Sequence, residues 1–369
     1  MNRVVGKSGN TLQLEGGLNL DFKTSLNARV AKVHNMVTGV GIENLTIERT
    51  VDDGASGQSG NLYFNYVANS WVRGVHSINA VRAHIYFNNS YKNEVRGNYI
   101  ERSYNNGPGG HGYGVRLESA TDLLIENNIA KLMRHSYLAQ VGSNGNVFGY
   151  NYSADPYGAD HGEIYTDLST HGGFAFSNLF EGNQAQQAKV DNIHASNVGN
   201  LFFRNRIEQD IDNFTHKDRL MPKGATTPQI WVHENQYYNS FLANEISFPG
   251  ANPATQTRGH DSGRPRDNFT VCKYTNSSNG ERGCGRTRDT TVNHGTHDYL
   301  KNETTWDNSI STRGFPASAY LNGRPSFWGS SPWPMYGPDT LSLGENQKQI
   351  PAKVRFMEAS QGRGSFCQR

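Results

Sequence analysis

The sequence predicts an all-β fold: a single-stranded right-handed parallel β-helix with an irregular C-terminal tail packed back on the solenoid. Three observations predict it: a short recurring motif, apolar–polar alternation beside that motif, and a composition too polar for a compact globule. Hydrophobic residues make up only 35% of the 369 residues, and the mean hydropathy is −0.70. A solenoid has a thin core and exposes most of its side chains, so it accommodates such a composition.

The recurring motif consists of apolar residues, then a polar residue or glycine, then asparagine, then a second strand-like pair. Asparagine tolerates a left-handed corner and can hydrogen-bond to equivalent residues in the coils above and below. Coils of roughly 22 to 32 residues would stack at the spacing of neighbouring strands, about 4.8 Å. The motif therefore predicts an asparagine ladder along one inner corner, at Asn98, Asn128, Asn151, Asn183, Asn205 and Asn235.

A second strand precedes each motif, at residues 83–87, 114–118, 136–139 and 192–195. These segments alternate apolar and polar residues, so one face should point into the coil and the other to solvent. On this basis the outer face is expected to carry His84, Tyr86, Arg116, Glu118, Tyr137, Asp167 and His194.

The spacing of the motifs alternates between short and long, and the extra residues follow the motif strand. They fall at residues 51–60, 104–113, 154–163 and 210–227. Insertions at one corner of successive coils stack into a wall along one side of the solenoid. The second and third insertions, with their flanks, place further polar and aromatic candidates on this side: His111, Tyr113, Asp155, Asp160, His161, Glu163 and Tyr165.

The repeat fades after about residue 240, and the predicted boundaries are a β-helix at 1–245 and a capping tail at 246–369 within the same structural unit. A cap is needed because an open last coil exposes strand edges. Cys272 and Cys284 flank a polar loop and are expected to form a disulfide, the alternative being two free thiols. Cys367 has no partner in this interpretation.

Charge and hydropathy exclude several classes of partner. The net charge of +2, without basic runs or zinc spacings, argues against a nucleic-acid partner. No apolar stretch is long enough to span a membrane. We expect a monomer that is secreted, extracellular or periplasmic, with an export signal upstream of the first residue.

His, Tyr, Arg and carboxylates concentrate between residues 84 and 194, which favours a polysaccharide-binding face. Elimination from a uronate needs a cation, a base and an acid. The candidate catalytic residues are His135, Tyr137, His161, Arg116, Arg134, Asp160, Glu163, Asp167 and His194. The candidate substrate-binding residues are His84, Tyr86, His111, Tyr113, Tyr165, His171, Lys189 and Asp191.

Two further possibilities stay open at this point. Asp155, Asp160 and Glu163 lie on a glycine-containing stretch and could hold Ca²⁺ in place of a cationic side chain; otherwise no cofactor is expected. A glycoside hydrolase would instead pair Asp160 or Glu163 with Asp167 or Asp191. A third reading is a glycan-binding adhesin without catalysis.

Over about residues 10 to 245 the ladder and coil length resemble the pectin-lyase-like superfamily of right-handed β-helices. Leu132-Met-Arg-His135 and Asn178-Leu-Phe-Glu-Gly-Asn183 are similar to alginate lyases and chondroitinases of this fold, which use a basic residue and an arginine with Ca²⁺. Gly110-His-Gly-Tyr-Gly114 resembles the Gly-His-Gly of polygalacturonases, but the paired aspartates and Arg-Ile-Lys of that family are absent. The tail is similar to exported bacterial β-helix proteins.

Residues and resemblance together favour a secreted polysaccharide-degrading enzyme. More specifically, we expect a polysaccharide lyase that cleaves a uronic-acid-containing glycan by β-elimination in an open groove. The alternatives are the hydrolase and the adhesin described above.

Overall fold

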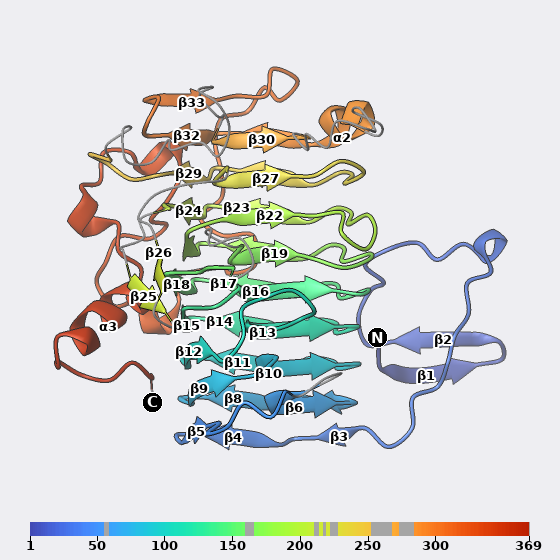
Figure 1. The fold of residues 1–369 in the computed structure, drawn as a ribbon. Helices are drawn as coiled ribbons and strands as arrows, with labels where there is room; N and C mark the ends of the chain where they lie inside the picture. Colours follow the sequence, from blue (N-terminus) through green and yellow to red (C-terminus); the bar gives the residue numbers. More distant parts are fainter. Residues whose placement is uncertain are drawn as a thin grey trace.

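A computed structural model shows a chain that winds repeatedly through three long sheets (Figure 1). It describes residues 1–54, 59–158, 166–209, 214–216, 219–221, 228–251, 268–272 and 284–368. Nearly all regular structure in this part is short strands, and strands of successive coils pair in parallel. This architecture is all-β and consistent with the parallel β-helix that the sequence predicts.

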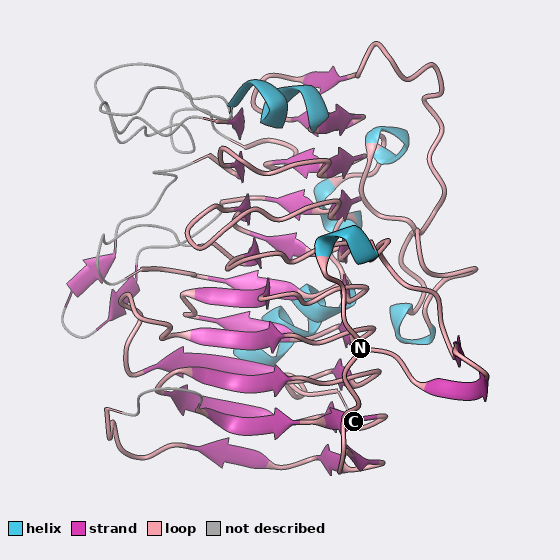
Figure 2. Ribbon diagram, turned by 90° about the vertical axis from the view of Figure 1, so that its right-hand side faces the viewer, coloured by secondary structure: helices cyan, strands magenta, loops and turns pink. Residues whose placement is uncertain are grey.

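Each coil passes through sheet 1, sheet 2 and sheet 3 in turn, and Figure 2 shows the strands stacked along the solenoid. Sheet 1 contains β6 (Gly60–Asn65), β10 (Ala83–Asn88), β13 (Tyr113–Glu118), β16 (His135–Gln140), β19 (Leu168–Thr170), β22 (Ala188–Val190), β27 (Ile230–Val232) and β30 (Phe269–Val271). Sheet 2 contains β4 (Gly41–Glu43), β8 (Trp71–Arg73), β11 (Glu94–Arg96), β14 (Leu124–Glu126), β17 (Val147–Gly149), β20 (Leu179–Glu181), β23 (Leu201–Phe203), β28 (Ser240–Leu242) and β31 (Val292–His294).

Sheet 3 ends with a strand that runs antiparallel to its neighbour. It contains β5 (Thr46–Glu48), β9 (His76–Ala80), β12 (Tyr99–Ser103), β15 (Ile129–Lys131), β18 (Tyr152–Ala154), β21 (Gln184–Ala185), β24 (Arg206–Ile207), β29 (Glu245–Ile246), β32 (Thr296–Asp298) and β33 (Glu303–Thr305). The remaining strands and α-helices are β1 (Val4–Ser8), β2 (Thr11–Leu14), β3 (Val37–Thr38), β7 (Val67–Ala68), β25 (Phe214–His216), β26 (Arg219–Met221), α2 (Cys284–Thr290) and α3 (Pro351–Ser360). Short 3₁₀ helices lie at Thr24–Leu26, Ser326–Trp328, Pro338–Thr340 and Glu345–Gln347. No helix of the described chain is long and apolar enough to cross a lipid bilayer.

The core is a column of apolar side chains enclosed by the three sheets. Equivalent positions of sheet 2 carry Phe148, Phe180, Phe202 and Phe241, whose rings lie 4.6, 4.6 and 4.8 Å apart. These separations match the spacing of neighbouring strands, so parallel stacking of coils brings like residues into ring contact.

Buried asparagines form ladders at two corners rather than one. At the corner between sheets 2 and 3, each amide nitrogen donates to the next amide oxygen at 2.9–3.0 Å, through Asn98, Asn128, Asn151, Asn183, Asn205 and Asn244. A second ladder, between sheets 1 and 2, runs through Asn146, Asn178, Asn200 and Asn239. The prediction was wrong for Asn235: its motif follows a sheet 1 strand, whereas the equivalent sheet 2 strand leads to Asn244.

Long and short connections alternate between sheets 3 and 1 as far as β27, as the motif spacing predicts, and the next connection, from β29 to β30, is long again. Two differences concern the strands. Residues 192–195 form no strand, and the sheet 1 strand of that coil is β22 instead. The solenoid also continues past residue 245, because β30, β31 and β32 each pair with the preceding coil.

The two terminal segments cover two of the three corners. The N-terminal segment reaches the corner between sheets 1 and 2, where the Asn19 amide donates to Asn144 at 2.8 Å. The tail follows the corner between sheets 2 and 3, from Phe315 beside Gly295 to Gln368 N, which donates to Gly97 O at 2.9 Å. Figure 1 shows the tail on one side of the stack and the β1–β2 hairpin on the other.

The cysteines are free thiols in this structure. Cys272 and Cys284 are both buried, and each sulfur lies 3.8 Å from the carbonyl oxygen of the other residue. The expected disulfide is therefore not formed, although the two residues are neighbours.

Candidate functional site

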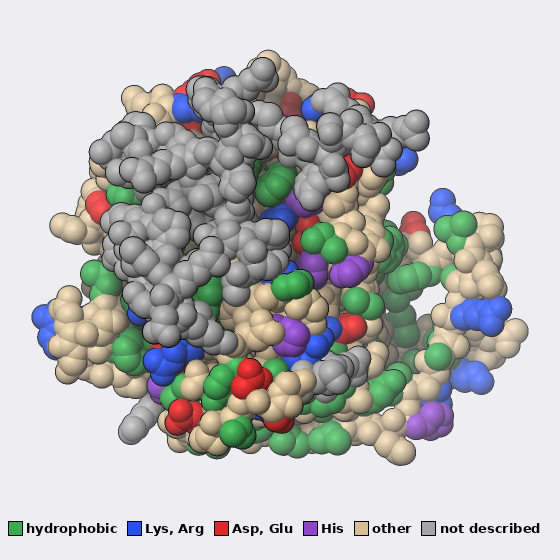
Figure 3. All heavy atoms as spheres, in the orientation of Figure 1, with side chains coloured by type: hydrophobic (Ala, Val, Ile, Leu, Met, Phe, Trp, Pro, Cys, Tyr) green, Lys and Arg blue, Asp and Glu red, His purple; other side chains and the backbone are tan. Residues whose placement is uncertain are grey.

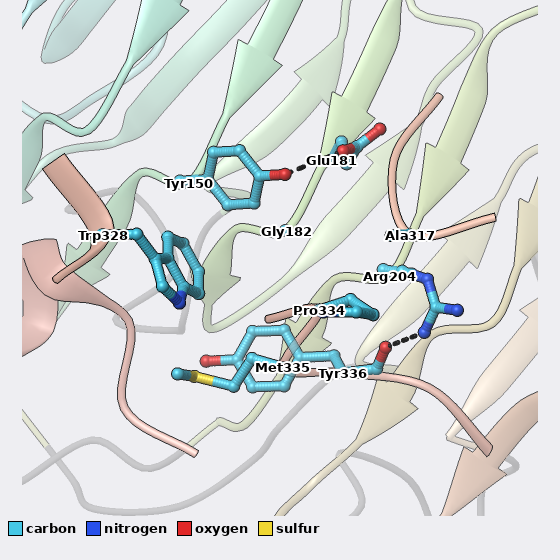
Figure 4. Close-up of a pocket in the computed structure, with 9 residues that line it drawn as sticks. All are labelled: Tyr150, Glu181, Gly182, Arg204, Ala317, Trp328, Pro334, Met335 and Tyr336. Atoms are coloured by element: carbon cyan, nitrogen blue, oxygen red, sulfur yellow. Dashed lines mark hydrogen bonds between the residues drawn. The ribbon is translucent and has the colours of Figure 1, made fainter. Parts of the chain in front are cut away.

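A small pocket lies between the solenoid and the tail, but its polar groups are already bonded (Figure 4). Glu181 accepts hydrogen bonds from Tyr150 and from Ala319 N, at 2.9 and 2.8 Å. Arg204 donates to both carboxylate oxygens of Asp339 at 2.8 Å. This cavity is part of the tail's docking surface and offers little to a polar ligand.

The outer face of sheet 1 carries two parallel rows of functional side chains. The first row contains one residue from each strand: Tyr63, Tyr86, Arg116, Leu138, Ser169, Lys189 and Trp231. The second row, two residues further along each strand, contains Asn65, Asn88, Glu118, Gln140, His171, Asp191 and His233. Figure 3 shows histidine, basic and acidic side chains gathered over this sheet.

The second row contains a hydrogen-bonded histidine–aspartate pair. His171 Nδ1 lies 2.6 Å from Asp191 Oδ2, and both side chains are buried. Burial alone would raise the pKa of Asp191, but the charge and hydrogen bond of His171 hold it well below the usual range. A carboxylate only accepts, so Nδ1 of His171 carries a proton, and Nε2 is the ring nitrogen that can accept one when the ring is neutral.

Four rings lie in series across the start and centre of this face. The centroid distances are 5.2 Å from Tyr113 to His135, 5.3 Å from His135 to His171 and 5.2 Å from His171 to His194. Burial, followed by the charges of Arg134 and His171, lowers the pKa of His135 well below its ordinary value. His194 is exposed, so one end of the series reaches solvent.

A cation–aromatic pair borders the histidines on the next strands. Lys189 Nζ lies 4.7 Å from the centre of the Trp231 ring. Burial, and then the charge of Lys189, lowers the pKa of His233 to about 3. His233 is therefore neutral at pH 7, and Lys189 supplies the positive charge of this region.

At the other end of the sheet 1 face, Arg116 contacts two tyrosine rings and a carboxylate. Its guanidinium carbon lies 4.4 Å from the Tyr86 ring centre and 5.5 Å from that of Tyr113. Arg116 donates to Glu118 at 2.8 Å, and Tyr86 OH donates to the same carboxylate. With its amide oxygen facing the guanidinium, Gln140 accepts from Arg116 Nε and Nη2 at 2.7 and 2.8 Å.

Three predicted outer residues lie inside the coil instead. His84 contacts Ser77 Oγ and Arg102 O, both at 2.8 Å. Tyr137 belongs to the apolar core, and its hydroxyl donates to Tyr152 O at 3.1 Å. Asp167 accepts from Ser136 at 2.9 Å, from Ser153, and from the backbone N–H of Gln186 at 2.7 Å.

The reason is a break in alternation at the start of the sheet 1 strands. Ala83 packs with the outward-facing Tyr86, whereas the two residues after Ala83, His84 and Ile85, both lie inside the coil. In the next strand Leu138 points outward and packs with Tyr86 and Tyr113, which leaves Tyr137 inside. Asp167 precedes its strand and turns to the buried serines of the corner.

The remaining predicted residues have peripheral positions or lie outside the described part. His111 lies on the connection before β13, with Nδ1 2.9 Å from Pro108 O. Asp155 lies 3.9 Å from Lys131 Nζ at the end of sheet 3. Outside the described residues are Asp160, His161, Glu163 and Tyr165. Among those described, no three metal-binding side chains gather at one point.

The sequence interpretation missed Gln140, Trp231 and His233. Each follows the register of sheet 1, so a correct strand alignment would have found them. Trp231 in particular precedes the motif at Asn235, and the predicted asparagine ladder gave that motif a structural role.

The comparisons with known proteins give no further guide to this site, since no family model, curated protein or solved structure matches the chain.

Proposed function

We propose that this protein is a secreted right-handed β-helix enzyme of the pectin-lyase-like kind, and that it cleaves a uronic-acid polysaccharide by β-elimination. The observation that carries the proposal is the His171–Asp191 pair on the outer face of sheet 1, with Lys189 on the neighbouring strand. Right-handed connections between parallel strands of one sheet are the strong general rule, which supports the handedness.

Each of these residues has a separate role in the proposed reaction. His171 Nε2 takes the proton from the carbon beside the sugar carboxylate, and Asp191 stabilises the imidazolium that forms. Lys189 neutralises the carboxylate, so that negative charge can build up on it. The electrons of the C–H bond form a C=C bond, and the glycosidic C–O bond breaks. His194, exposed beside His171, gives a proton to the leaving oxygen.

A hydrolase is less well supported by the carboxylates that the structure describes. Glu118 and Asp191 share a row but lie three strands apart, about 14 Å at the strand spacing. Paired carboxylates of glycosidases lie about 5 to 9.5 Å apart. Asp167 is inside the coil and already accepts several hydrogen bonds.

The test is digestion of a panel of uronate and neutral polysaccharides, with products followed by near-ultraviolet absorbance and mass spectrometry. A lyase releases unsaturated, absorbing ends from at least one uronate polymer. New reducing ends without absorbance would indicate a hydrolase, and binding without turnover would indicate an adhesin; either outcome contradicts the proposal.

A further inference from the structure

Three arginines surround Tyr113 at the end of the sheet 1 face that lies away from Lys189. Arg82, Gly112 and Arg134 come directly before aligned positions of β10, β13 and β16. Backbone hydrogen bonds hold this alignment: Tyr113 N donates to Arg82 O at 2.8 Å, and Arg134 N donates to Gly112 O at 2.7 Å. Arg116 reaches the same place from within β13, with its guanidinium over the Tyr113 ring.

Glycines leave room beside these side chains. A Cβ at Gly110 would lie 2.5 Å from Arg82 Nη2, and one at Gly112 would lie 2.9 Å from Arg134 Cβ. Both glycines have positive φ, +83° and +72°, which other residues rarely adopt. The local backbone therefore depends on glycine and lets the guanidinium groups approach Tyr113.

Two of these arginines, Arg82 and Arg116, are not fully satisfied within the described residues. Glu118 is the carboxylate bound to Arg116, at 2.8 Å. Arg82 Nε and Arg116 Nη1 are buried and have no hydrogen-bond partner in the part of the chain that the structure describes. Buried donors on cationic groups are costly unless something accepts from them, so this arrangement indicates an anionic ligand.

We propose that Arg82 and Arg116, beside Tyr113, form a second anion subsite, which binds an acidic group, carboxylate or sulfate, on a sugar several residues from the cleaved bond. Guanidinium groups bind both kinds of planar or multidentate oxyanion through paired N–H donors. Burial raises the pKa of the Tyr113 hydroxyl, the charges of Arg134, Arg116 and Arg82 lower it and that of Asp191 raises it, so the arginine charges lie near that ring.

The subsite rests on the proposed function for its polysaccharide and adds a requirement to it. Arg116 and Lys189 lie three strands apart in one row, about 14 Å. A substrate that satisfies both must carry acidic groups at recurring positions. Leu138 and Ser169 lie between them, and the buried Ser169 hydroxyl has no partner among the described residues.

The experiment measures binding by calorimetry in a His171→Ala background, so that turnover does not interfere. The probes are an oligogalacturonate hexamer, a sulfated chondroitin hexasaccharide and a carboxyl-reduced neutral hexamer. We expect Arg116→Met and Arg82→Met each to weaken binding of the acidic probe about tenfold or more, because a charge-assisted contact is lost. Binding of the neutral hexamer should not change. The matched control is Arg73→Met, an arginine on the outside of sheet 2 that pairs with Glu94.

Removing Arg116 leaves Glu118 without its cation, so Arg116→Met/Glu118→Gln provides a variant without an uncompensated charge. Tighter binding of either acidic probe supports the subsite and identifies its preferred group. Equal binding of acidic and neutral probes, or equal weakening of both in the arginine variants, overturns it. Failure of the proposed function is distinct, because it shows as absent unsaturated product in the parent enzyme.

Discussion

The outer face of sheet 1 and the tail-covered corner both bury charged groups, but they do so differently. At the corner two buried cations meet their opposites: Lys348 pairs with Glu245 and Arg204 with Asp339. On sheet 1, Arg82 and Arg116 keep buried donors without partners among the described residues. Internally paired charges are typical of a surface that holds two parts of a chain together, whereas unmatched ones are typical of a ligand site.

The comparison explains why the cavity at the corner is not the favoured site. A pocket is attractive for a ligand when its polar groups converge on empty space. At the corner the Glu181 carboxylate and the Arg204 guanidinium are bound to the chain's own groups. The histidines of sheet 1 instead contact one another in series, and His194 opens to solvent.

The largest expected effect comes from breaking the sheet 1 site. His171→Ala should lower turnover of the responsive uronate polymer about 10²- to 10⁴-fold, because it removes the general base. Initial rates of absorbance increase measure this. The matched change at the corner is Glu181→Gln, which should alter stability and leave the rate of folded enzyme unchanged. A similar loss of rate in both variants would contradict the assignment.

The second largest effect is expected from a substitution at the tail-covered corner. Lys348→Met leaves the fully buried Glu245 without its cation, and removal of one partner of a buried pair costs about 3 to 5 kcal/mol of unfolding free energy. Denaturant unfolding followed by circular dichroism measures the loss. Lys348→Met/Glu245→Gln should recover much of it, and an unchanged midpoint in the single variant would show that the pair contributes nothing.

The solenoid was predictable because its signals are local and repeat. Five asparagines of the predicted ladder are in place, and the long connections fall where the motif spacing puts them. The last coil was missed because long connections separate β29, β30 and β31, which removes the regular spacing. The tail could not be placed from sequence, since its contacts join residues more than 100 positions apart, as between Arg204 and Asp339.

The site was predictable as a region but less so as an arrangement. Strict alternation placed His84 and Tyr86 on one face, yet the strand turns both His84 and Ile85 inward. The same local break moves Tyr137 into the core. No local pattern reports that His171 meets Asp191, because this contact depends on the register between β19 and β22.

Acid should sharpen the distinction between inner and outer histidines. Burial lowers the pKa of His84 to about 4, although the hydrogen bond to Arg102 O acts in the opposite direction. The unfolded chain takes up this proton near pH 6.5, so stability is lost as pH falls from about 6.5 toward 4. Between pH 7 and 4.5 we expect His84 to account for about 2 to 3 kcal/mol of lost unfolding free energy.

His84→Gln tests this, because the amide retains polar contacts and does not titrate. Its unfolding free energy should fall less steeply between these pH values than that of the parent protein. Its turnover at neutral pH should match the parent's, as expected for an interior residue. A lowered rate with an unchanged pH dependence would instead return His84 to the outer face, where alternation had placed it.

The smallest effect concerns the corrected ladder under the tail. Asn244 Oδ1 accepts from Asn205 Nδ2 at 3.0 Å, and its own amide donates to Phe202 O at 2.9 Å. Asn244→Ala leaves buried polar groups without partners and should cost about 1 to 3 kcal/mol. Asn235→Gly, at a residue outside the ladder whose φ of +60° glycine adopts readily, should change unfolding free energy by less than about 0.5 kcal/mol. Unfolding free energies from denaturant titration test this order. A larger loss at Asn235 than at Asn244 would indicate that Asn235 belongs to the ladder and that amide stacking does not stabilise the corner beneath the tail.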